Sequence, residues 1–260
     1  MMEIRSSRAH LRESARVMPE PLLWRAHTDA VNSALVARWL PPRGVAALKT
    51  DLFDESVSEG LYATLASHAG TVTGVDLSEP TTHAAARRHP ELRAVCADVR
   101  SLPFDDAEFD FIASNSTLDH LESVAEIATA IAELSRVMAR GARLVITLDN
   151  PLNPAVAVRN RLPFRWTSRA GLTPYRVGAT CGARQLAWLL ADAGLDVLES
   201  TAIMHCPRVV AVAVARAVES VGRPDARAGY LRLMLHFERL QALPSRFVTG
   251  HFVAATARKP

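Results

Sequence analysis

The chain has 260 residues, of which 49% are hydrophobic and 22% are charged, and its formal net charge is +3. That length suits one α/β domain with an added cap, or at most two small domains. The net charge is too small, and the basic residues are too scattered, to indicate a nucleic-acid surface.

The cysteines and the apolar segments favour a soluble cytoplasmic protein. Cys96, Cys181 and Cys206 have no zinc-binding spacing, and widely spaced free thiols are typical of a reduced compartment. The N-terminus lacks the apolar core of a signal peptide, and the run 209–214 is much too short to span a membrane. We therefore expect neither a membrane nor a nucleic acid as a partner.

Residues 1–43 favour helix and contain no strand pattern, which predicts an N-terminal helical lid. Thr28 is placed to cap a helix that ends before Pro41. Its expected apolar face holds Val31, Leu35, Val36, Trp39 and Leu40.

From residue 44 onward, short apolar runs alternate with helical patterns. The runs predict strands at 45–48, 71–76, 92–98, 109–114 and 144–148. Helices are expected at 57–69, after the cap Ser78, and after the capping box that begins at Ser123. Nearly continuous apolar strands alternating with helices predict a doubly wound, mostly parallel α/β sheet with helices on both faces.

Polar residues follow four successive strands of this predicted sheet. They are Asp51, Asp76, Asp98 and Asn115. In parallel α/β sheets the ligand crevice lies beyond the carboxyl ends of the strands. The pattern therefore predicts a ligand site at this edge.

The second half of the chain departs from simple alternation. Residues 150–184 and about 205–245 are predicted to be cap segments of one domain that covers 44–260. Within this half, a helix is expected at 185–193, a strand at 195–203, an amphipathic helix at 225–243 and an edge strand at 252–256, while 209–221 is compatible with helix or strand. The last strand is expected to run antiparallel and to complete seven strands.

The segment from Val95 to Phe104, followed by the strand Phe109-Asp110-Phe111-Ile112, resembles the middle of the class I S-adenosylmethionine-dependent methyltransferases. The order of elements is similar over roughly three quarters of the chain. This resemblance implies that Asp76 holds the cofactor ribose, that Asp98 meets the adenine amino group, and that Val99 offers its amide to the ring. One carboxylate can accept protons from two hydroxyls, so an acid suits the ribose position.

The chain departs from the family at the first strand, where the family has an acid followed by spaced glycines. Aligned on Asp51, this loop reads Asp-Leu-Phe-Asp-Glu-Ser-Val and contains no glycine. Its side chains would crowd a close backbone approach, although its carboxylates suit the ammonium and sulfonium charges of the cofactor. The resemblance implies S-adenosylmethionine contacts at Thr50, Asp51, Phe53, Asp76, Leu77, Asp98, Val99 and Asn115.

His120 is the candidate catalytic residue, because it follows the fourth strand, where the family places groups near the transferred methyl. An imidazole can accept a proton from the attacking hydroxyl or amine near neutral pH. Asp119 is a candidate to orient it. Many methyl transfers need no base, since alignment of the reactants does most of the work.

Candidate substrate contacts are His27, Arg159 and His205, which lie in the segments predicted to cap the pocket. Arg159, Arg161, Arg165 and Arg169 favour an anionic substrate. The pair Asp149-Asn150 suggests a cation site, but the acid that would complete it after the fourth strand is missing, so no metal is expected.

These features predict methyl transfer to an oxygen or nitrogen of a small molecule. The glycine-free loop leaves open an enzyme of the same fold that does not methylate, such as a cyclase, and a non-catalytic partner subunit. A dinucleotide dehydrogenase fits worse, since the first strand lacks the GxGxxG pattern. The sequence also leaves a homodimer open.

Overall fold

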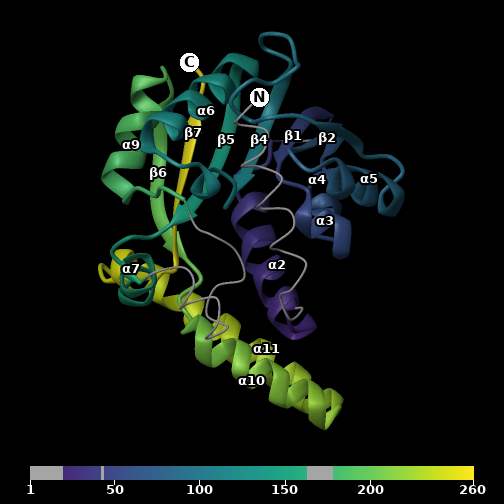
Figure 1. The fold of residues 1–260 in the computed structure, drawn as a ribbon, viewed down its shortest axis with the longest axis vertical. Helices are drawn as coiled ribbons and strands as arrows, with labels where there is room; N and C mark the ends of the chain where they lie inside the picture. The colour runs from purple at the N-terminus through teal and green to yellow at the C-terminus, as the bar shows by residue number, and fades with distance from the viewer. Residues whose placement is uncertain (1–19, 42–43, 163–177) are drawn as a thin grey trace.

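The computed structural model describes residues 20–41, 44–162 and 178–260 and shows a doubly wound α/β sheet (Figure 1). Its seven strands lie in the order β3-β2-β1-β4-β5-β7-β6. β7 runs antiparallel to both of its neighbours, as predicted. The strands are β1 Val45–Thr50, β2 Ala69–Asp76, β3 Arg93–Cys96, β4 Phe109–Asn115, β5 Met138–Asp149, β6 Asp196–Ile203 and β7 Phe252–Arg258.

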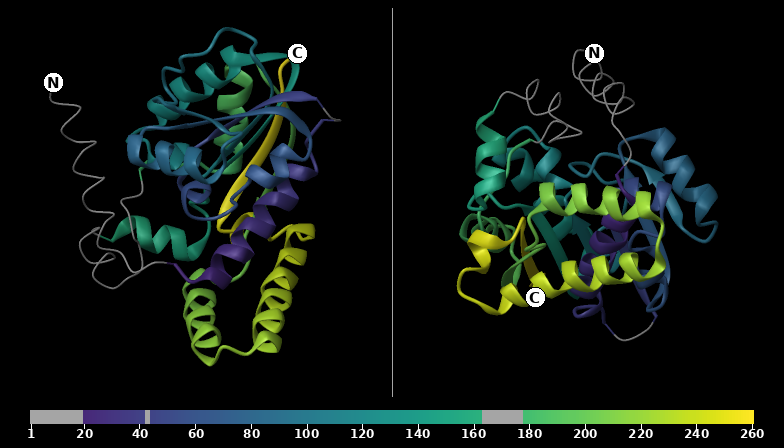
Figure 2. Two further views of the ribbon diagram at one scale, coloured as in Figure 1. Left: turned by 90° about the vertical axis from the view of Figure 1, so that its right-hand side faces the viewer. Right: turned by 90° about the horizontal axis from the view of Figure 1, so that it is seen from below.

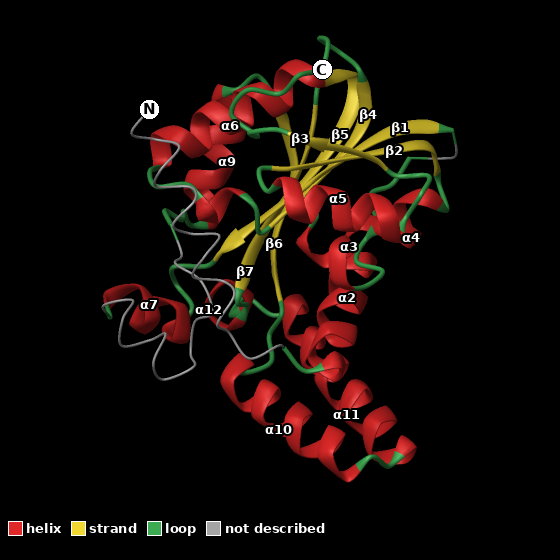
Figure 3. Ribbon diagram, turned by 45° about the vertical axis from the view of Figure 1, so that its right-hand side comes forward, coloured by secondary structure: helices red, strands yellow, loops and turns green. Residues whose placement is uncertain are grey.

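The helices lie on both faces of the sheet and at its carboxyl edge (Figure 3). The α-helices are α2 Leu22–Ala37, α3 Phe53–Val57, α4 Tyr62–Ala66, α5 Glu79–Arg88, α6 Val124–Val137, α7 Pro154–Arg161, α9 Ala183–Asp192, α10 Arg208–Val221, α11 Pro224–His236 and α12 Arg246–Thr249. Two 3₁₀ helices, η2 Leu118–His120 and η3 Phe237–Ala242, complete the described elements.

Alternate residues of the strands pack into two separate cores. Leu48 and Ile112 face the core formed with α6 and α9. Ala47 and Phe111 face the opposite core, which holds α2, α4, α5 and the α10–α11 hairpin. This alternation follows from the two-residue period of a strand and explains why the strands read as continuous apolar runs.

Three sequence expectations for individual elements are wrong. The strand at 252–256 is not at an edge, because β7 lies between β5 and β6. The expected helix over 57–69 is replaced by α3 and α4, which are separated at Gly60, where φ is +52°. Thr28 does not cap a helix: α2 already begins at Leu22, and the Thr28 hydroxyl donates to the carbonyl of Arg25 inside it.

The α10–α11 hairpin is an insertion between β6 and β7 that projects from the body (Figures 1 and 2). It resolves the ambiguity of 209–221 in favour of helix. Its inner residues Ala211, Ala215 and Tyr230 pack in the same core as Trp24 of α2. The Tyr230 hydroxyl also donates to the Ala211 carbonyl at 3.1 Å, which ties the two helices of the hairpin together.

No helix within the described ranges is both long enough and apolar enough to cross a bilayer.

Candidate active site

The parallel strands end together at one edge of the sheet. Thr50 of β1 pairs with Val75 of β2 and with Ser114 of β4. The polar residues that follow these strands, Asp51, Asp76 and Asn115, are therefore brought to one edge, as the sequence predicts.

A buried ion pair closes the loop after β1. Lys49 Nζ lies 2.7 Å from Glu55 Oε2, and the two side chains are 5% and 0% exposed. Glu55 Oε1 accepts the Leu61 amide at 2.8 Å, and Lys49 Nζ donates to the Asp51 carbonyl at 2.5 Å. A Cβ on Gly60 would lie 2.4 Å from Glu55 Oε1, so the loop closes around this carboxylate only with glycine there.

Lys49 keeps its charge in this position. Burial disfavours the ammonium form, but the attraction of the Glu55, Asp51 and Asp54 carboxylates outweighs burial and raises the Lys49 pKa. The glycine-free loop is thus built around charges that neutralise one another.

Asp51 takes the backbone conformation that glycine favours. Its φ is +67°, in the left-handed region that Asp tolerates better than most residues. Its Oδ1 accepts the Phe53 amide at 2.7 Å and stabilises the turn locally. Burial, with the charge of Asp76 adding to it, raises the Asp51 pKa to about 6.

Asp76 connects the loop to the end of β2. Its Oδ2 accepts the Leu52 amide at 2.9 Å and its Oδ1 accepts the Ser78 amide at 2.7 Å. Leu52 packs on Gly74, where a Cβ would lie 2.4 Å from Leu52 Cδ2, so glycine at this position leaves room for the Leu52 side chain. Since a carboxylate has about four acceptor positions, Asp76 keeps capacity for two more donors.

Asp98 is engaged by a neighbouring cation. Both of its oxygens accept bonds from Arg100, including Nη2 to Oδ2 at 2.7 Å. These bonds lower the Asp98 pKa. Arg100 Nη1 also donates to Glu126 at 2.6 Å, so an adenine amino group would share Asp98 with a guanidinium that is already held in place.

Two large apolar side chains stand exposed beside the acids of this edge. Phe53 is 53% exposed and Leu77 is 57% exposed. The guanidinium of Arg25 lies 5.5 Å from the centre of the Phe53 ring. Apolar surface beside convergent polar groups is typical of small-molecule sites.

The polar face of α2 covers the loop after β1, and the sequence analysis missed it. Arg25 lies 3.5 Å from Asp54, and Asn32 Oδ1 accepts from Asn115 Nδ2 at 3.4 Å. Burial, with the charges of Asp54 and Glu55 adding to it, raises the Asp29 pKa to about 6. The spacing i, i+4, i+7 of Arg25, Asp29 and Asn32, opposite the apolar stripe, is the signal that would have identified this face.

The three predicted substrate contacts are engaged inside the protein. His27 is buried 3.3 Å from Cys206 Sγ, and burial lowers its pKa to about 4, so the ring is neutral. His205 is buried, with its ring nitrogens 2.8 Å from the Thr249 hydroxyl and 3.0 Å from the Ala202 carbonyl. Arg159 pairs with Asp149 at 2.5 Å. Arg165 and Arg169 lie outside the described residues.

Thr50 and Asn115 have different surroundings. The Thr50 hydroxyl is buried in a cluster with Ser114 at 2.9 Å and Thr117 at 2.7 Å, which joins β1 to the loop after β4. Asn115 Oδ1 is buried and has no hydrogen-bond partner among the described residues. The Asn115 side-chain oxygen therefore has unused acceptor capacity, whereas the Thr50 hydroxyl is already engaged.

His120 is exposed at the end of η2, next to a buried Asp119. Asp119 Oδ2 accepts from the Ser116 hydroxyl at 2.8 Å and from the Asp149 amide at 3.2 Å. Burial, with the charge of Asp149 adding to it, raises the Asp119 pKa to about 6. The electrostatic effect of His120 lowers the pKa of both Asp119 and Asp51 and so opposes the effect of burial. His120 therefore lies near these two carboxylates.

Asp149 and Asn150 serve internal contacts. Besides its pair with Arg159, Asp149 lies 3.5 Å from His251 Nε2. The Asn150 amide group donates to the carbonyls of Phe247 and Gly250, both at 2.8 Å. Within the described ranges, no three His, Cys, Asp or Glu side chains are grouped so as to hold a metal ion.

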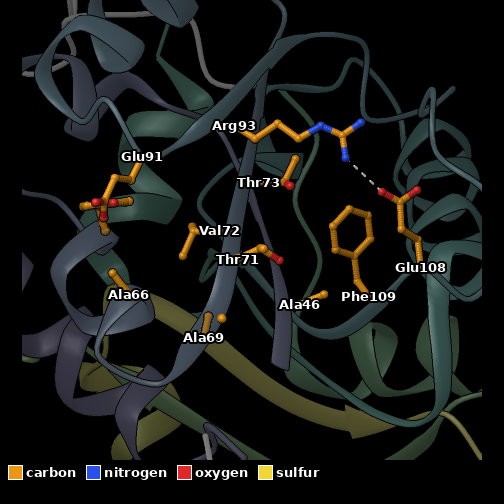
Figure 4. A pocket seen from close by; sticks show the side chains of 12 residues that line it. Ala46, Ala66, Ala69, Thr71, Val72, Thr73, Glu91, Arg93, Glu108 and Phe109 are labelled. Atoms are coloured by element: carbon orange, nitrogen blue, oxygen red, sulfur yellow. Dashed lines mark hydrogen bonds and ion pairs between the residues drawn. The ribbon is translucent and has the colours of Figure 1, made fainter. Parts of the chain in front are cut away.

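A cavity of about 270 Å³ lies at the opposite edge of the sheet, near the amino ends of β1, β2 and β4 (Figure 4). Its lining includes Ala46, Thr71 and Phe109, and the pair Arg93–Glu108 spans 3.2 Å beside it. None of the predicted site residues lines it. The acids and the exposed apolar side chains therefore belong to a different edge from this cavity.

Comparison with known proteins supports the resemblance. Residues 54–146 match a family model described as a methyltransferase domain. A probable S-adenosylmethionine-dependent methyltransferase of Mycobacterium tuberculosis is 27% identical over 176 residues, which are 67% of this chain and 58% of that protein. An uncharacterized 37.1 kDa transposon protein of Streptomyces fradiae is 32% identical over 53% of this chain and 40% of its own length. The chain thus spans about half the length of these relatives.

Solved structures share the fold at low identity. A geranyl diphosphate C-methyltransferase from Streptomyces coelicolor, solved with S-adenosyl-L-homocysteine, has a TM-score of 0.58 at 16% identity, covering 89% of this chain and 79% of that one. The [4+2]-cyclase SpnF also has a TM-score of 0.58, at 22% identity, covering 89% and 80%.

Replacing Lys49 with Met tests the ion pair. It leaves Glu55 as a buried carboxylate without its cation, which is expected to lower the free energy of unfolding by about 3–5 kcal/mol. Urea denaturation followed by circular dichroism measures this loss, and Lys49→Met/Glu55→Gln should recover part of it. Arg38→Met, which breaks the exposed 2.9 Å pair with Glu199, is the control and should cost at most about 1 kcal/mol. Equal losses in Lys49→Met and Arg38→Met would contradict this account.

Proposed function

The chain belongs to the class I S-adenosylmethionine-dependent methyltransferases, and on this premise we propose that it transfers a methyl group to an oxygen or nitrogen of a small molecule. The observation that carries the proposal is Asp76, which ends β2 at the carboxyl edge with acceptor capacity to spare. S-adenosylmethionine, when bound, supplies a methyl group on a positively charged sulfur.

The residues at this edge fit such a cofactor. Asp29 and Asp51 have raised pKa values because their negative charges are desolvated and only partly compensated. A ligand with ammonium and sulfonium charges would supply the missing compensation. In the proposed complex Asp76 accepts the ribose hydroxyls, and the exposed Phe53 and Leu77 offer apolar surface to the adenosine.

The contacts to adenine are proposed at Asp98 and Val99. The Asp98 carboxylate would receive the amino group while it remains bonded to Arg100. Because Arg100 is anchored to Glu126 as well, it holds Asp98 ready in one orientation. The cost is that Asp98 has few free acceptor positions, so this contact is expected to add less affinity than Asp76.

We propose that His120 accepts the proton of the attacking hydroxyl or amine. It is exposed at the same edge as Asp51 and Asp119. Asp119 is held by Ser116 and by the Asp149 amide, so it fixes the turn that carries His120 and adds negative charge that stabilises an imidazolium.

Substrate contacts are proposed on α2 and after β4. Asn115 and Asn32 lie together beside Asp29, and the side-chain oxygen Oδ1 of Asn115 has no hydrogen-bond partner among the described residues. An anionic substrate has less support than the sequence indicated, since the Arg159 charge is neutralised by Asp149. These acceptors favour a substrate that donates hydrogen bonds, such as an amine or a hydroxyl compound.

Calorimetric titration with S-adenosylmethionine and S-adenosylhomocysteine tests the cofactor site. Asp76→Ala is expected to weaken binding about tenfold or more, since hydrogen bonds to a charged group contribute about 1.5–3 kcal/mol. Asp196→Ala, which changes an exposed aspartate at the opposite edge of the sheet, is the matched control and should bind as the wild type does. Absence of binding at millimolar ligand in the wild type would overturn the proposal.

Cofactor binding is also expected to depend on pH. Asp29 and Asp51, with pKa values of about 6, are protonated below pH 6 and then lose their attraction for a cation. Their raised pKa values mean that the free protein loses stability as pH rises through 6, and a cationic ligand offsets this loss. The thermal shift caused by S-adenosylmethionine should therefore be larger at pH 7.5 than at pH 5.5. Asp29→Asn should reduce this difference, and a pH-independent shift would contradict the assignment.

His120→Gln tests the proposed base. Transfer of a labelled methyl group to a panel of phenols and amines should slow by about 10²–10⁴-fold, while S-adenosylhomocysteine affinity stays unchanged. A variant with the wild-type rate would show that the transfer needs no base at this position.

A further inference from the structure

The outer face of α10 is apolar, although it faces solvent. Val209, Val210, Val214 and Val221 are 58%, 60%, 39% and 62% exposed. Val210, Val214 and Val221 recur at i, i+4 and i+11, so they lie on one side of the helix, with the exposed Ala213 and Ala217 between them. Arg216 and Ser220 are the polar residues of the exposed side.

The inner face of the same helix is already packed. Ala211 and Ala215 are 2% and 0% exposed, in the core that contains α2 and α11. α10 is therefore apolar on both sides, and a helix apolar all round is normally covered on both sides. A contiguous exposed apolar face of this kind marks a surface that meets a partner.

Positive charge is concentrated on the same hairpin. The hairpin, residues 208–236, contains five arginines and the two acidic residues Glu219 and Asp225, an excess equal to the net +3 of the whole chain. Glu219 and Glu238 are used internally: Glu219 accepts the Leu23 amide, and Glu238 accepts the amides of Met204 and His205. The exposed arginines of α10, of the turn, of α11 and of η3 are Arg216, Arg223, Arg227, Arg232 and Arg239.

The hairpin also stands apart from the body. It projects beyond the carboxyl edge of the sheet, so its tip can reach a flat surface ahead of the α/β domain (Figures 1 and 3). The tip itself combines the exposed Val221 with Arg223.

From these features we propose that the α10–α11 hairpin docks on an anionic phospholipid bilayer. The valines of α10 enter the interface between headgroups and acyl chains, and the arginines bind the lipid phosphates. The hairpin lies on the bilayer and does not span it. This mode differs from the sequence expectation that no membrane is a partner, which rested on the lack of a spanning segment. Charge favours this partner over a second copy, because pairing two hairpins would bring their arginines together. The inference concerns this surface and does not depend on the proposed methyl transfer.

Vesicle flotation with the full chain tests the proposal. The protein should float with vesicles of phosphatidylcholine and phosphatidylglycerol in a three-to-one ratio, and much less with phosphatidylcholine alone. Binding should fall at high salt, because charges are screened within about 3 Å at 1 M salt. Val210→Ser/Val221→Ser and Arg223→Glu/Arg227→Glu should each weaken binding about tenfold or more.

Matched controls separate this surface from other exposed residues. Leu198→Ser and Arg87→Glu/Arg88→Glu change exposed positions on β6 and α5 and should float as the wild type does. All variants should keep the wild-type circular dichroism spectrum. Absence of flotation with anionic vesicles would overturn the proposal, as would equal binding to neutral vesicles. A dimer in sedimentation equilibrium that Val210→Ser/Val221→Ser dissociates, without vesicle binding, would assign the face to a second copy.

Discussion

The buried pair of Lys49 and Glu55 is the constraint on which the candidate site depends. Residues 51–57 of the loop after β1 contain no glycine to let the backbone fold closely, so the loop is shaped instead by an ammonium and a carboxylate that must satisfy each other away from water. Glu55 accepts a hydrogen bond from the Leu61 amide, and Lys49 donates one to the Asp51 carbonyl. With the loop fixed, the Leu52 amide reaches Asp76, and the ends of β1 and β2 become one rigid unit.

Four of the acids at this edge fall into two groups. Asp98 and Asp149 each have an arginine partner and are therefore balanced within the protein. Asp29 and Asp51 share the nearby Lys49 with Glu55, so their ionisation remains unfavourable. This uneven compensation of charge, more than the number of acids, is the basis for proposing a positively charged ligand at this edge.

What the sequence predicts well is what short-range chemistry determines. Ser78 caps α5, and Ser123 Oγ accepts the Glu126 amide at the start of α6, because capping needs only neighbours in the chain. The strand ends that carry Asp51, Asp76 and Asn115 follow from apolar periodicity and from the geometry of parallel sheets. The position of β7 inside the sheet and the two short helices around Gly60 depend on distant partners and could not be read locally. His27 and Asp29 show the same limit: they are two residues apart on one helix, yet one packs against Cys206 and the other lies near Asp54.

The packing of α2 against the α10–α11 hairpin has a consequence for the order of folding. Trp24 and Tyr230 share a core although about two hundred residues separate them in the chain. On a ribosome, α2 is among the first described elements to be made, but the surface that buries Trp24 emerges only after about two hundred further residues. Closing so long a loop is slow, so strands β1 to β5 can pair earlier, before α2 finds its partner surface. A nascent chain released before α11 would hold α2 and most of the strands but would lack the surface against which α2 packs when Asp29 and Asn32 lie over the strand ends.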